Sequence, residues 1–287
     1  MKVSAVVPTL GRSRLLTDCL KALRSEGAEI VLVDQGDFPA EIPSGLADRV
    51  LRPGRNLGFA AGTNLGIATA AGEWIATVND DAVVEPGWLT VLLAALEGDS
   101  GAAAAQGVNL VLDRPDLADG CGLEWNRWWQ AVQIGHGQPA PAPGSGVREV
   151  FGVSATAAVY RRAALRAVAA DGEVFDSRLG SYYEDVDLAV RLRAAGWRAL
   201  LVPAARALHA GSATGRTLSR ERWRLIYGNR YVVAARFLGR GFWPRLPILA
   251  ARDGIDLGRA LLRRDSGLAA GILGGWGRAL RQFPRPR

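Results

Sequence analysis

Apolar, strand-like runs alternate with helix-like segments along the first hundred residues, and this alternation restricts the fold more than any other feature. Continuous runs of β-branched and aliphatic residues predict buried strands at residues 2–9, 29–37, 48–53 and 73–81. The segments between and after them predict helices at residues 13–27, 62–72 and 85–98. Strands that alternate with helices predict a parallel α/β sheet. The 287 residues, 49% of them apolar, suffice to bury such a sheet in a substantial core.

The pattern weakens from about residue 100 to residue 147. The stretch at residues 137–146 is rich in proline and glycine, which predicts a loop or linker. Regular elements are expected again beyond it, as a strand region at residues 148–162, a helix at 182–196 and a strand at 197–203. His209 is expected to follow the last of these strands after a short connection.

Polar side chains gather where the predicted strands end, at Thr9, Asp34, Asp80 and Asp81. In parallel α/β sheets ligands bind beyond the carboxyl ends of the strands, so these positions predict a binding site. A carboxylate at the end of a buried strand is costly unless another group compensates its charge. The aspartate pair therefore needs a partner, and either a bound cation or a turn capped by the aspartates meets this need.

The aspartate pair has the chemistry of a site for a hard divalent cation. Mg²⁺ and Mn²⁺ prefer carboxylate and water oxygens, and Mn²⁺ also accepts imidazole. Asp80 and Asp81 can supply carboxylates, and His209 can supply a nitrogen. A cation held by so few ligands keeps open positions for a diphosphate, whose charge it would neutralise. The other histidine, His136, lies in a loop and is interpreted as an ordinary loop residue.

A second acidic cluster, Glu184, Asp185 and Asp187, stands at the start of the helix predicted at residues 182–196. A carboxylate there could act as a general base. The alternative is a helix start enriched in acids because they interact favourably with the helix dipole. For Asp187 we favour the structural interpretation, since Arg191 lies four residues later and can pair with it. For Asp185 both interpretations stay open on residue types alone.

Several function classes lack their motifs. No G-x-G-x-x-G follows the first predicted strand and no G-x-x-x-x-G-K-[ST] occurs, which weakens nicotinamide-binding and P-loop hypotheses. The two cysteines, Cys19 and Cys121, form neither a disulfide framework nor a C-x-x-C pair, so a reduced, cytoplasmic setting is expected. The first apolar run is too short for a signal-peptide core, and no stretch approaches the roughly 20 apolar residues of a membrane span.

Charge is divided unevenly along the chain, whose net charge is +7. Residues 206–287 carry 17 arginines and four acids, which gives +13 and leaves 7 − 13 = −6 for the remainder. Arginine alternates there with aromatic and aliphatic residues, which predicts amphipathic helices with basic faces. Such helices can lie on an anionic membrane, here the inner face of the plasma membrane, or pack on the core with solvated arginines. No nucleic-acid-binding signature accompanies the charge, and no nucleic-acid partner is expected.

Taken together, these motifs resemble the family 2 glycosyltransferases of GT-A fold, in the branch that includes rhamnosyltransferases and galactofuranosyltransferases. The closest stretch is RNLGFAAGTNLGIATAAGEWIATVNDDAVVEPGWL, residues 55–89. The further matching stretches, in the same order as in the family, are VVPTLGR, IVLVDQGD, FGVSATAAVYRRAAL and YYEDVDLAVRLRAAGWRALLVPAARALHAGSAT. The resemblance covers about residues 3–215, and several spaced motifs in the correct order make it specific.

The resemblance implies an α/β fold of Rossmann-like, nucleotide-diphospho-sugar transferase type, with a mixed sheet flanked by helices. It implies a GT-A catalytic domain at residues 1–215, and the basic amphipathic helices predicted from the arginine pattern form an extension at residues 216–287. Within the catalytic domain, the nucleotide-binding half is expected at about residues 1–100 and the acceptor half at about residues 148–215.

The resemblance also assigns site residues. Asp81 and His209 match ligands of Mn²⁺ or Mg²⁺, and Asp185 matches the catalytic base. The positions that match the nucleotide-sugar pocket are Thr9, Asp34, Arg55, Asn56, Asn64, Asn79 and Asp80. The positions expected to reach the acceptor or the diphosphate are Glu184, Trp223 and Arg230. Asn79 replaces the first acid of the family's metal-binding motif, and this departure leaves the preferred nucleobase open.

The implied activity is that of a metal-dependent, inverting hexosyltransferase in cell-wall or polysaccharide biosynthesis. The donor would be a dTDP- or UDP-sugar, with rhamnose favoured, and the acceptor a hydroxyl of a glycan, a lipid-linked glycan or a small molecule. Two alternatives remain: a non-catalytic sugar-nucleotide-binding or scaffold protein of the same fold, and a nucleotidyltransferase. The presence of Asp81, Asp185 and His209 argues against the scaffold.

Overall fold

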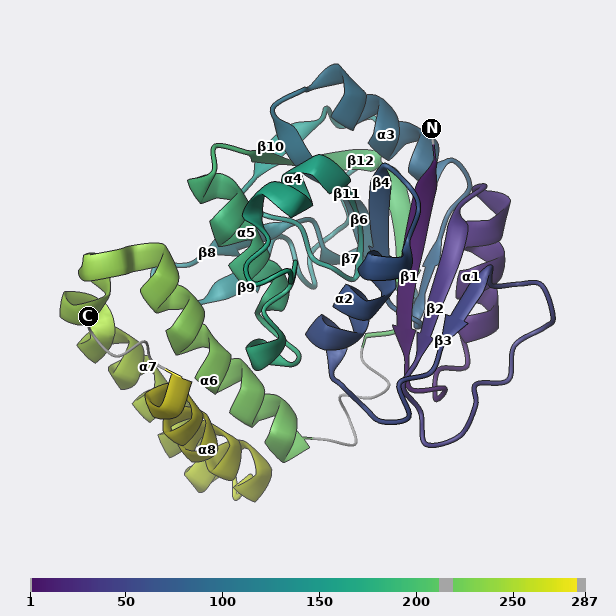
Figure 1. Cartoon of the computed structure of the whole chain (residues 1–287). Helices are drawn as coiled ribbons and strands as arrows, with labels where there is room; N and C mark the ends of the chain where they lie inside the picture. The colour runs from purple at the N-terminus through teal and green to yellow at the C-terminus, as the bar shows by residue number, and fades with distance from the viewer. Residues whose placement is uncertain (1, 212–218, 283–287) are drawn as a thin grey trace.

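A mixed sheet forms the centre of the protein (Figure 1). The computed structural model describes residues 2–211 and 219–282. Within them, eight strands follow the order β10-β12-β6-β11-β4-β1-β2-β3, while β5 pairs with β12 and β7 pairs with β6. The strand bounds are β1 (Val3–Thr9), β2 (Glu29–Asp34), β3 (Arg49–Leu51), β4 (Trp74–Val78), β5 (Ala82–Val84), β6 (Ala102–Val111), β7 (Arg114–Gly120), β10 (Arg148–Val150), β11 (Ala157–Arg161) and β12 (Arg198–His209). A separate pair is formed by β8 (Leu123–Trp125) and β9 (Ala131–Gln133).

The parallel arrangement predicted from strand and helix alternation holds for the first four strands. Strands β3, β2, β1 and β4 run parallel to one another. Beyond them, β11 lies antiparallel between β4 and β6, and β12 returns parallel to β6. The sheet is therefore mixed, as the resemblance implies, and the parallel arrangement expected from alternation extends over its first half.

Helices cover both faces of the sheet, because successive side chains of a strand point to opposite sides. On one face, α1 (Leu16–Ser25) and α3 (Trp88–Gly98) bury their leucines against the sheet. On the other face, the covering helices are α2 (Phe59–Thr69), α4 (Arg162–Val168) and α5 (Glu184–Ala194). This two-faced burial leaves the strand ends as the place where polar side chains can meet a ligand.

Two regions differ from the sequence prediction. The stretch after residue 100, where the pattern weakens, contains the central strand β6 and its partner β7. Strand β12 continues through the predicted connection, so that His209 is its last residue. The length of β12 matters for the site, because a residue inside a paired strand has its position fixed by the register.

Three helices form a layer at the C-terminal end of the chain (Figure 1). They are α6 (Ser219–Leu238), α7 (Phe242–Leu262) and α8 (Ser266–Gln282), with a short 3₁₀ turn η2 (Gly239–Gly241) between the first two. The helical extension predicted from the arginine-rich residue pattern is present. Its boundary at residue 215/216 falls outside the described residues. None of the helices in the described residues has the length and hydropathy needed to cross a bilayer.

Candidate active site

A cleft of about 1040 Å³ lies beyond the carboxyl ends of β1 and β4. Three parts of the chain form its walls: the strand ends, the start of α5, and the C-terminal helices α6 and α8. The polar lining residues considered below are Thr9, Gln35, Asn56, Asn79, Asp80, Asp81, Asp119, His136, Glu184, Asp185, His209, Arg222, Trp223, Arg224, Arg230 and Arg278. The cleft therefore brings together both acidic clusters that the sequence singled out.

Strand pairing places His209 beside Asp81. Strand β5 follows Asp81 directly and pairs antiparallel with β12, with Ala82 opposite His209. The backbone N–H of Ala210 donates to the carbonyl of Asp81 at 3.1 Å. As a result, Nε2 of His209 lies 3.2 Å from Oδ1 of Asp81, and both side chains are more than nine-tenths buried. Residues 128 positions apart in sequence thus form one pair at the cleft floor.

Asp119, on β7, fixes the orientation of the His209 ring. Its Oδ2 lies 2.8 Å from Nδ1 of His209, so Nδ1 carries the proton that Asp119 accepts. Nε2, on the other side of the ring, has the carboxylate of Asp81 as its ion-pair partner. Burial by itself disfavours the charged ring, but Asp119 and Asp81 outweigh it and raise the pKa of His209 to about 9. Sequence analysis missed Asp119, because it lies in the region where the strand pattern weakens.

This donor set suits a divalent cation. The imidazole nitrogen Nε2 faces the carboxylate of Asp81, and the carboxylate of Asp119 holds the ring from behind, which is the usual support of a metal-bound histidine. Asp81 and His209 would be the ligands, with positions left for diphosphate oxygens. Within residues 2–211 and 219–282, no preformed group of three or more acidic, histidine or cysteine ligands occurs.

We expect Asp119→Asn to weaken Mn²⁺ binding by about 10–100-fold, because the asparagine cannot hold the ring and its tautomer as the carboxylate does. Isothermal titration of the purified protein with MnCl₂ measures the change. Asp116→Asn serves as the control, since this exposed aspartate lies on the same strand. Equal Mn²⁺ affinities in the two variants would show that Asp119 does not support the metal site.

The turn after β4 concentrates negative charge in a buried place. Oγ1 of Thr9 donates to Oδ2 of Asp80 at 2.5 Å. Burial and the charge of Asp81 together raise the pKa of Asp80 to about 6, although the hydrogen bond from Thr9 opposes the rise. A cation at this turn would offset the charge that burial penalises.

Asp185 lies at the start of α5 and faces the cleft. Its Oδ1 accepts from the backbone N–H of Val186 at 2.8 Å, and its Oδ2 accepts from that of Ala155 at 3.4 Å. The neighbouring Glu184 is buried, and its Oε2 makes no hydrogen bond. Burial raises the pKa of both carboxyl groups, and their mutual repulsion adds to the rise at Glu184. Because Asp185 receives the backbone donors, it is the better anion, and Glu184 is the better place for a proton.

The segment that presents Asp185 has a strained backbone. Tyr182 and Tyr183 both have positive φ, 66° and 72°. Such values are rare for aromatic residues, and a conformation of this kind persists only where surrounding contacts hold it. Asn229 of α6 provides these contacts: its Nδ2 donates to the carbonyls of Leu179, Ser181 and Tyr182 at 2.9, 3.1 and 2.7 Å.

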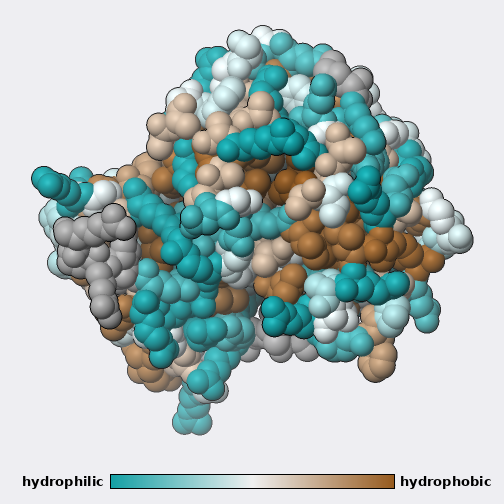
Figure 2. Space-filling model, in the orientation of Figure 1, coloured by the Kyte–Doolittle hydropathy of each residue, from teal (hydrophilic) through white to brown (hydrophobic). Residues whose placement is uncertain are grey.

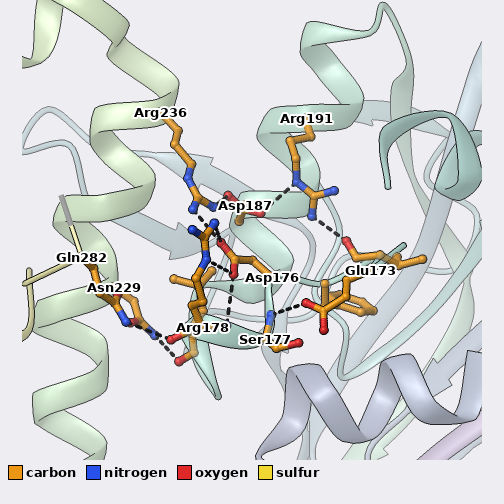
Figure 3. A network of polar contacts seen from close by, with 12 residues as sticks. Glu173, Asp176, Ser177, Arg178, Asp187, Arg191, Asn229, Arg236 and Gln282 are labelled. Carbon is orange, nitrogen blue, oxygen red and sulfur yellow. Dashed lines mark hydrogen bonds and ion pairs between the residues drawn. The ribbon is translucent and has the colours of Figure 1, made fainter. Parts of the chain in front are cut away.

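Charged groups from α6 reinforce the same connection (Figure 3). Asp187 is fully buried and accepts from Arg191 at 2.9 Å, as predicted from their spacing. Arg236 also donates to Asp187, and its second nitrogen donates to Asp176 at 2.6 Å. Burial disfavours the charged form of Asp176, but hydrogen bonds from Arg178 and Arg236 hold its pKa well below the usual range. The C-terminal helices thus fasten the acidic end of α5.

The predicted nucleotide-pocket residues divide into two groups. Those that line the cleft are Thr9, Asn56, Asn79 and Asp80, whereas those that do not are Asp34, Arg55 and Asn64. Asp34 is buried and accepts from the N–H of Ala40 and from Nε of Arg52. Asn64 exchanges two hydrogen bonds with the backbone of Phe175. In this structure Asp34 and Asn64 hold loops in place, while Gln35, which was not predicted, lines the cleft.

The predicted acceptor residues Glu184, Trp223 and Arg230 all line the cleft. The guanidinium of Arg230 is almost fully buried and pairs with Asp253 of α7 at 2.7 Å, so this charge is compensated inside the helical layer. His136 lines the cleft as well, with Nδ1 2.8 Å from the carbonyl oxygen of Asp119. Three further arginines reach the cleft from the helical layer, Arg222, Arg224 and Arg278. Sequence analysis did not single them out, because arginine is abundant throughout this region.

The fold is that of the GT-A glycosyltransferases. The structure superposes on a mannosyltransferase from Pyrobaculum calidifontis, solved with GDP-Man and Mn²⁺, with a TM-score of 0.57 at 16% identity over 99% of this chain and 88% of that chain. It also superposes on GalNAc-T7, solved with UDP, GalNAc and Mn²⁺, with a TM-score of 0.57 at 15% identity over 73% of this chain and 44% of that chain. At these identities the likeness concerns the fold alone.

The chain belongs to glycosyl transferase family 2, whose profile matches residues 4–168. A Mycobacterium tuberculosis protein, N-acetylglucosaminyl-diphospho-decaprenol L-rhamnosyltransferase, is 30% identical over 190 residues, which are 56% of this chain and 58% of that protein. The protein y4gI of Sinorhizobium fredii is 27% identical over 239 residues, which are 74% of this chain and 25% of that protein. The chain thus spans less than two thirds of the length of either relative.

Proposed function

We propose that the chain is a metal-dependent, inverting glycosyltransferase. It takes a sugar, with rhamnose favoured, from a dTDP or UDP donor to a hydroxyl of a glycan, a lipid-linked glycan or a small molecule. One observation carries the proposal: Asp185, with its half-buried carboxylate, lines the same cleft as the Asp81–His209 pair. The family membership and the names of the rhamnosyltransferase relative and of the Mn²⁺-bound neighbours support it.

In the proposed mechanism the acceptor hydroxyl meets Asp185. The carboxylate takes the hydroxyl proton as the acceptor oxygen forms its bond to the anomeric carbon. The bond from that carbon to the diphosphate oxygen breaks on the opposite side, so the configuration inverts and the nucleoside diphosphate leaves with the electron pair. A divalent cation held by Asp81 and His209 would neutralise charge on the leaving diphosphate. Thr9, Asn56, Asn79 and Asp80 are proposed to hold the nucleotide-sugar.

Calorimetric titration with dTDP, UDP and GDP, each with Mn²⁺ and again with EDTA, tests the donor site. We expect one nucleotide to bind in Mn²⁺, with EDTA or Asp81→Ala reducing its affinity by about tenfold or more. Equal binding in EDTA would contradict the metal role, and no binding under any condition would favour the scaffold. Release of pyrophosphate from a nucleoside triphosphate would favour a nucleotidyltransferase.

A further inference from the structure

The solvent face of α7 is apolar over the whole length of the helix. Ile248, Ile255, Leu261 and Leu262 are 42%, 48%, 64% and 87% exposed. Side chains spaced three and four residues apart share one side of a helix, and here they form two adjacent rows. The rows consist of Pro244, Ile248, Ala251, Ile255, Gly258 and Leu262, and of Trp243, Pro247, Ala250, Gly254, Leu257 and Leu261. No charged residue stands in either row.

The opposite side of α7 packs against the other C-terminal helices. Phe242, Leu249, Asp253 and Ala260 are its buried residues. Asp253 accepts from Tyr231 of α6 at 2.7 Å and from Trp276 of α8 at 2.9 Å. The core of this helical layer is therefore complete without the exposed rows. In Figure 2, hydrophobic residues are visible at the lower edge of the C-terminal helices, beside strongly hydrophilic ones.

The acidic and the basic residues of α7 differ in their exposure to solvent. The two acids of α7 turn inward: Asp253 is fully buried, and the side chain of Asp256 is only 16% exposed and pairs with Arg252. Exposed arginines stand at the end of the helix instead, at Arg259, Arg263 and Arg264. The next acid along the chain, Asp265, is exposed and accepts from the N–H of Leu268 at the start of α8. A lipid bilayer with anionic headgroups has a negatively charged layer above an apolar interior. An apolar helix face bordered by arginines is complementary to such a bilayer.

We infer that α7 is an interfacial helix that docks the protein on an anionic lipid bilayer, with its exposed rows in the headgroup–acyl boundary and its arginines at lipid phosphates. With 21 residues, α7 would lie along the surface for roughly 30 Å. Docking would bring the cleft, which α6 and α8 help to line, close to a lipid-linked acceptor. That consequence rests on the proposed function, whereas docking itself does not.

Cosedimentation of the purified full chain with vesicles tests the inference without any substrate. We expect binding to vesicles of phosphatidylcholine with phosphatidylglycerol, weaker binding at high salt, and little binding to phosphatidylcholine alone. Replacing the outer row by Ile248→Gln, Ile255→Gln and Leu262→Gln together is expected to reduce binding by about tenfold or more. Replacing Arg259, Arg263 and Arg264 by glutamine is expected to weaken binding to the anionic vesicles only.

Phe38→Gln is the matched control, because Phe38 is 83% exposed but lies far from α7, in the loop after β2. It should bind vesicles as the wild type does. Urea unfolding of each variant shows whether the fold is kept, which is expected since every replaced side chain is exposed. Undiminished vesicle binding by the triple apolar variant would overturn the inference. A wild-type dimer without vesicle affinity, which the same variant turns into a monomer, would overturn it as well.

Discussion

Asp185→Asn is expected to lower the rate of sugar transfer by about 10²–10⁴-fold, the usual contribution of a general base. Asparagine has the same shape and can still occupy the start of α5, but it cannot take the acceptor proton. Because Asp185 has no assigned contact with the nucleotide, donor affinity should stay within about twofold of the wild-type value, a change worth well under 1 kcal/mol. Single-turnover transfer and calorimetric donor binding, measured on the same preparation, separate the two effects.

Asp171→Asn is the control for this experiment. Asp171 is exposed and has a positive φ of 52°, which asparagine tolerates as well, so the substitution changes one carboxylate in the same region of the chain without strain. Its transfer rate should equal that of the wild type. If Asp185→Asn also turned over normally, Asp185 would not be the base.

The pH dependence of transfer provides a second test of the same residue. Burial raises the pKa of Asp185 above its ordinary value, and a base must be ionised to accept a proton. The rate should therefore fall as the pH falls through this raised pKa, above the value of about 3.9 for a solvated aspartate. Since Glu184 titrates with it, the acid limb of kcat/KM reports the pair. If kcat/KM fell only at or below the pKa of an ordinary aspartate, this would contradict the argument that burial raises the pKa of Asp185.

Arg236→Met is expected to lower the free energy of unfolding by about 3 kcal/mol, because it leaves the buried carboxylate of Asp187 with a single cation, Arg191. Methionine keeps most of the apolar stem, so the loss reflects the charge and its hydrogen bonds. Arg236 also holds Asp176, whose lowered pKa stabilises the fold above about pH 4. Asp176 loses this stabilising contribution as the pH falls from about 4 toward its own pKa in the folded state. Urea unfolding at neutral and acidic pH measures both.

Arg240→Met, at an exposed position four residues later, is the matched control and should change stability by less than about 0.5 kcal/mol. If the two variants were equally stable, the contact between α6 and the acidic end of α5 would not contribute to the fold. A selective loss in Arg236→Met would instead show that the helical layer stabilises the segment that presents Asp185.

The active-site candidates illustrate what residue patterns can and cannot predict. Asp80 and Asp81 stand out because charged residues rarely follow a buried strand without a partner. His209 has no such local signal, and its match to the family alone places it in the site. Asp119 has neither a local signal nor a family match. Its role depends on the pairing of β7 with β6, which brings Asp119 to the end of β12.

The central strand β6 shows a second limit. It begins with four alanines, Ala102–Ala105, which favour helices over strands by intrinsic propensity. All four are buried in the sheet, where neighbouring strands on both sides supply the backbone partners. At Gly107 an added Cβ would lie 2.1 Å from the carbonyl oxygen of Ala205, so close packing with β12 demands small residues. The composition reflects this packing, which periodicity cannot reveal.

The sequence by itself determined the strands and helices of the first hundred residues, the acids at the strand end, and the basic helical C-terminal region. These depend on periodicity and residue type within short windows. Only the tertiary structure decided that Asp119 holds His209 beside Asp81, that Asp34 and Asn64 bond inward, and that α7 exposes an apolar face. These outcomes depend on strand order, register and helix packing, which join residues far apart in the chain and leave no local pattern.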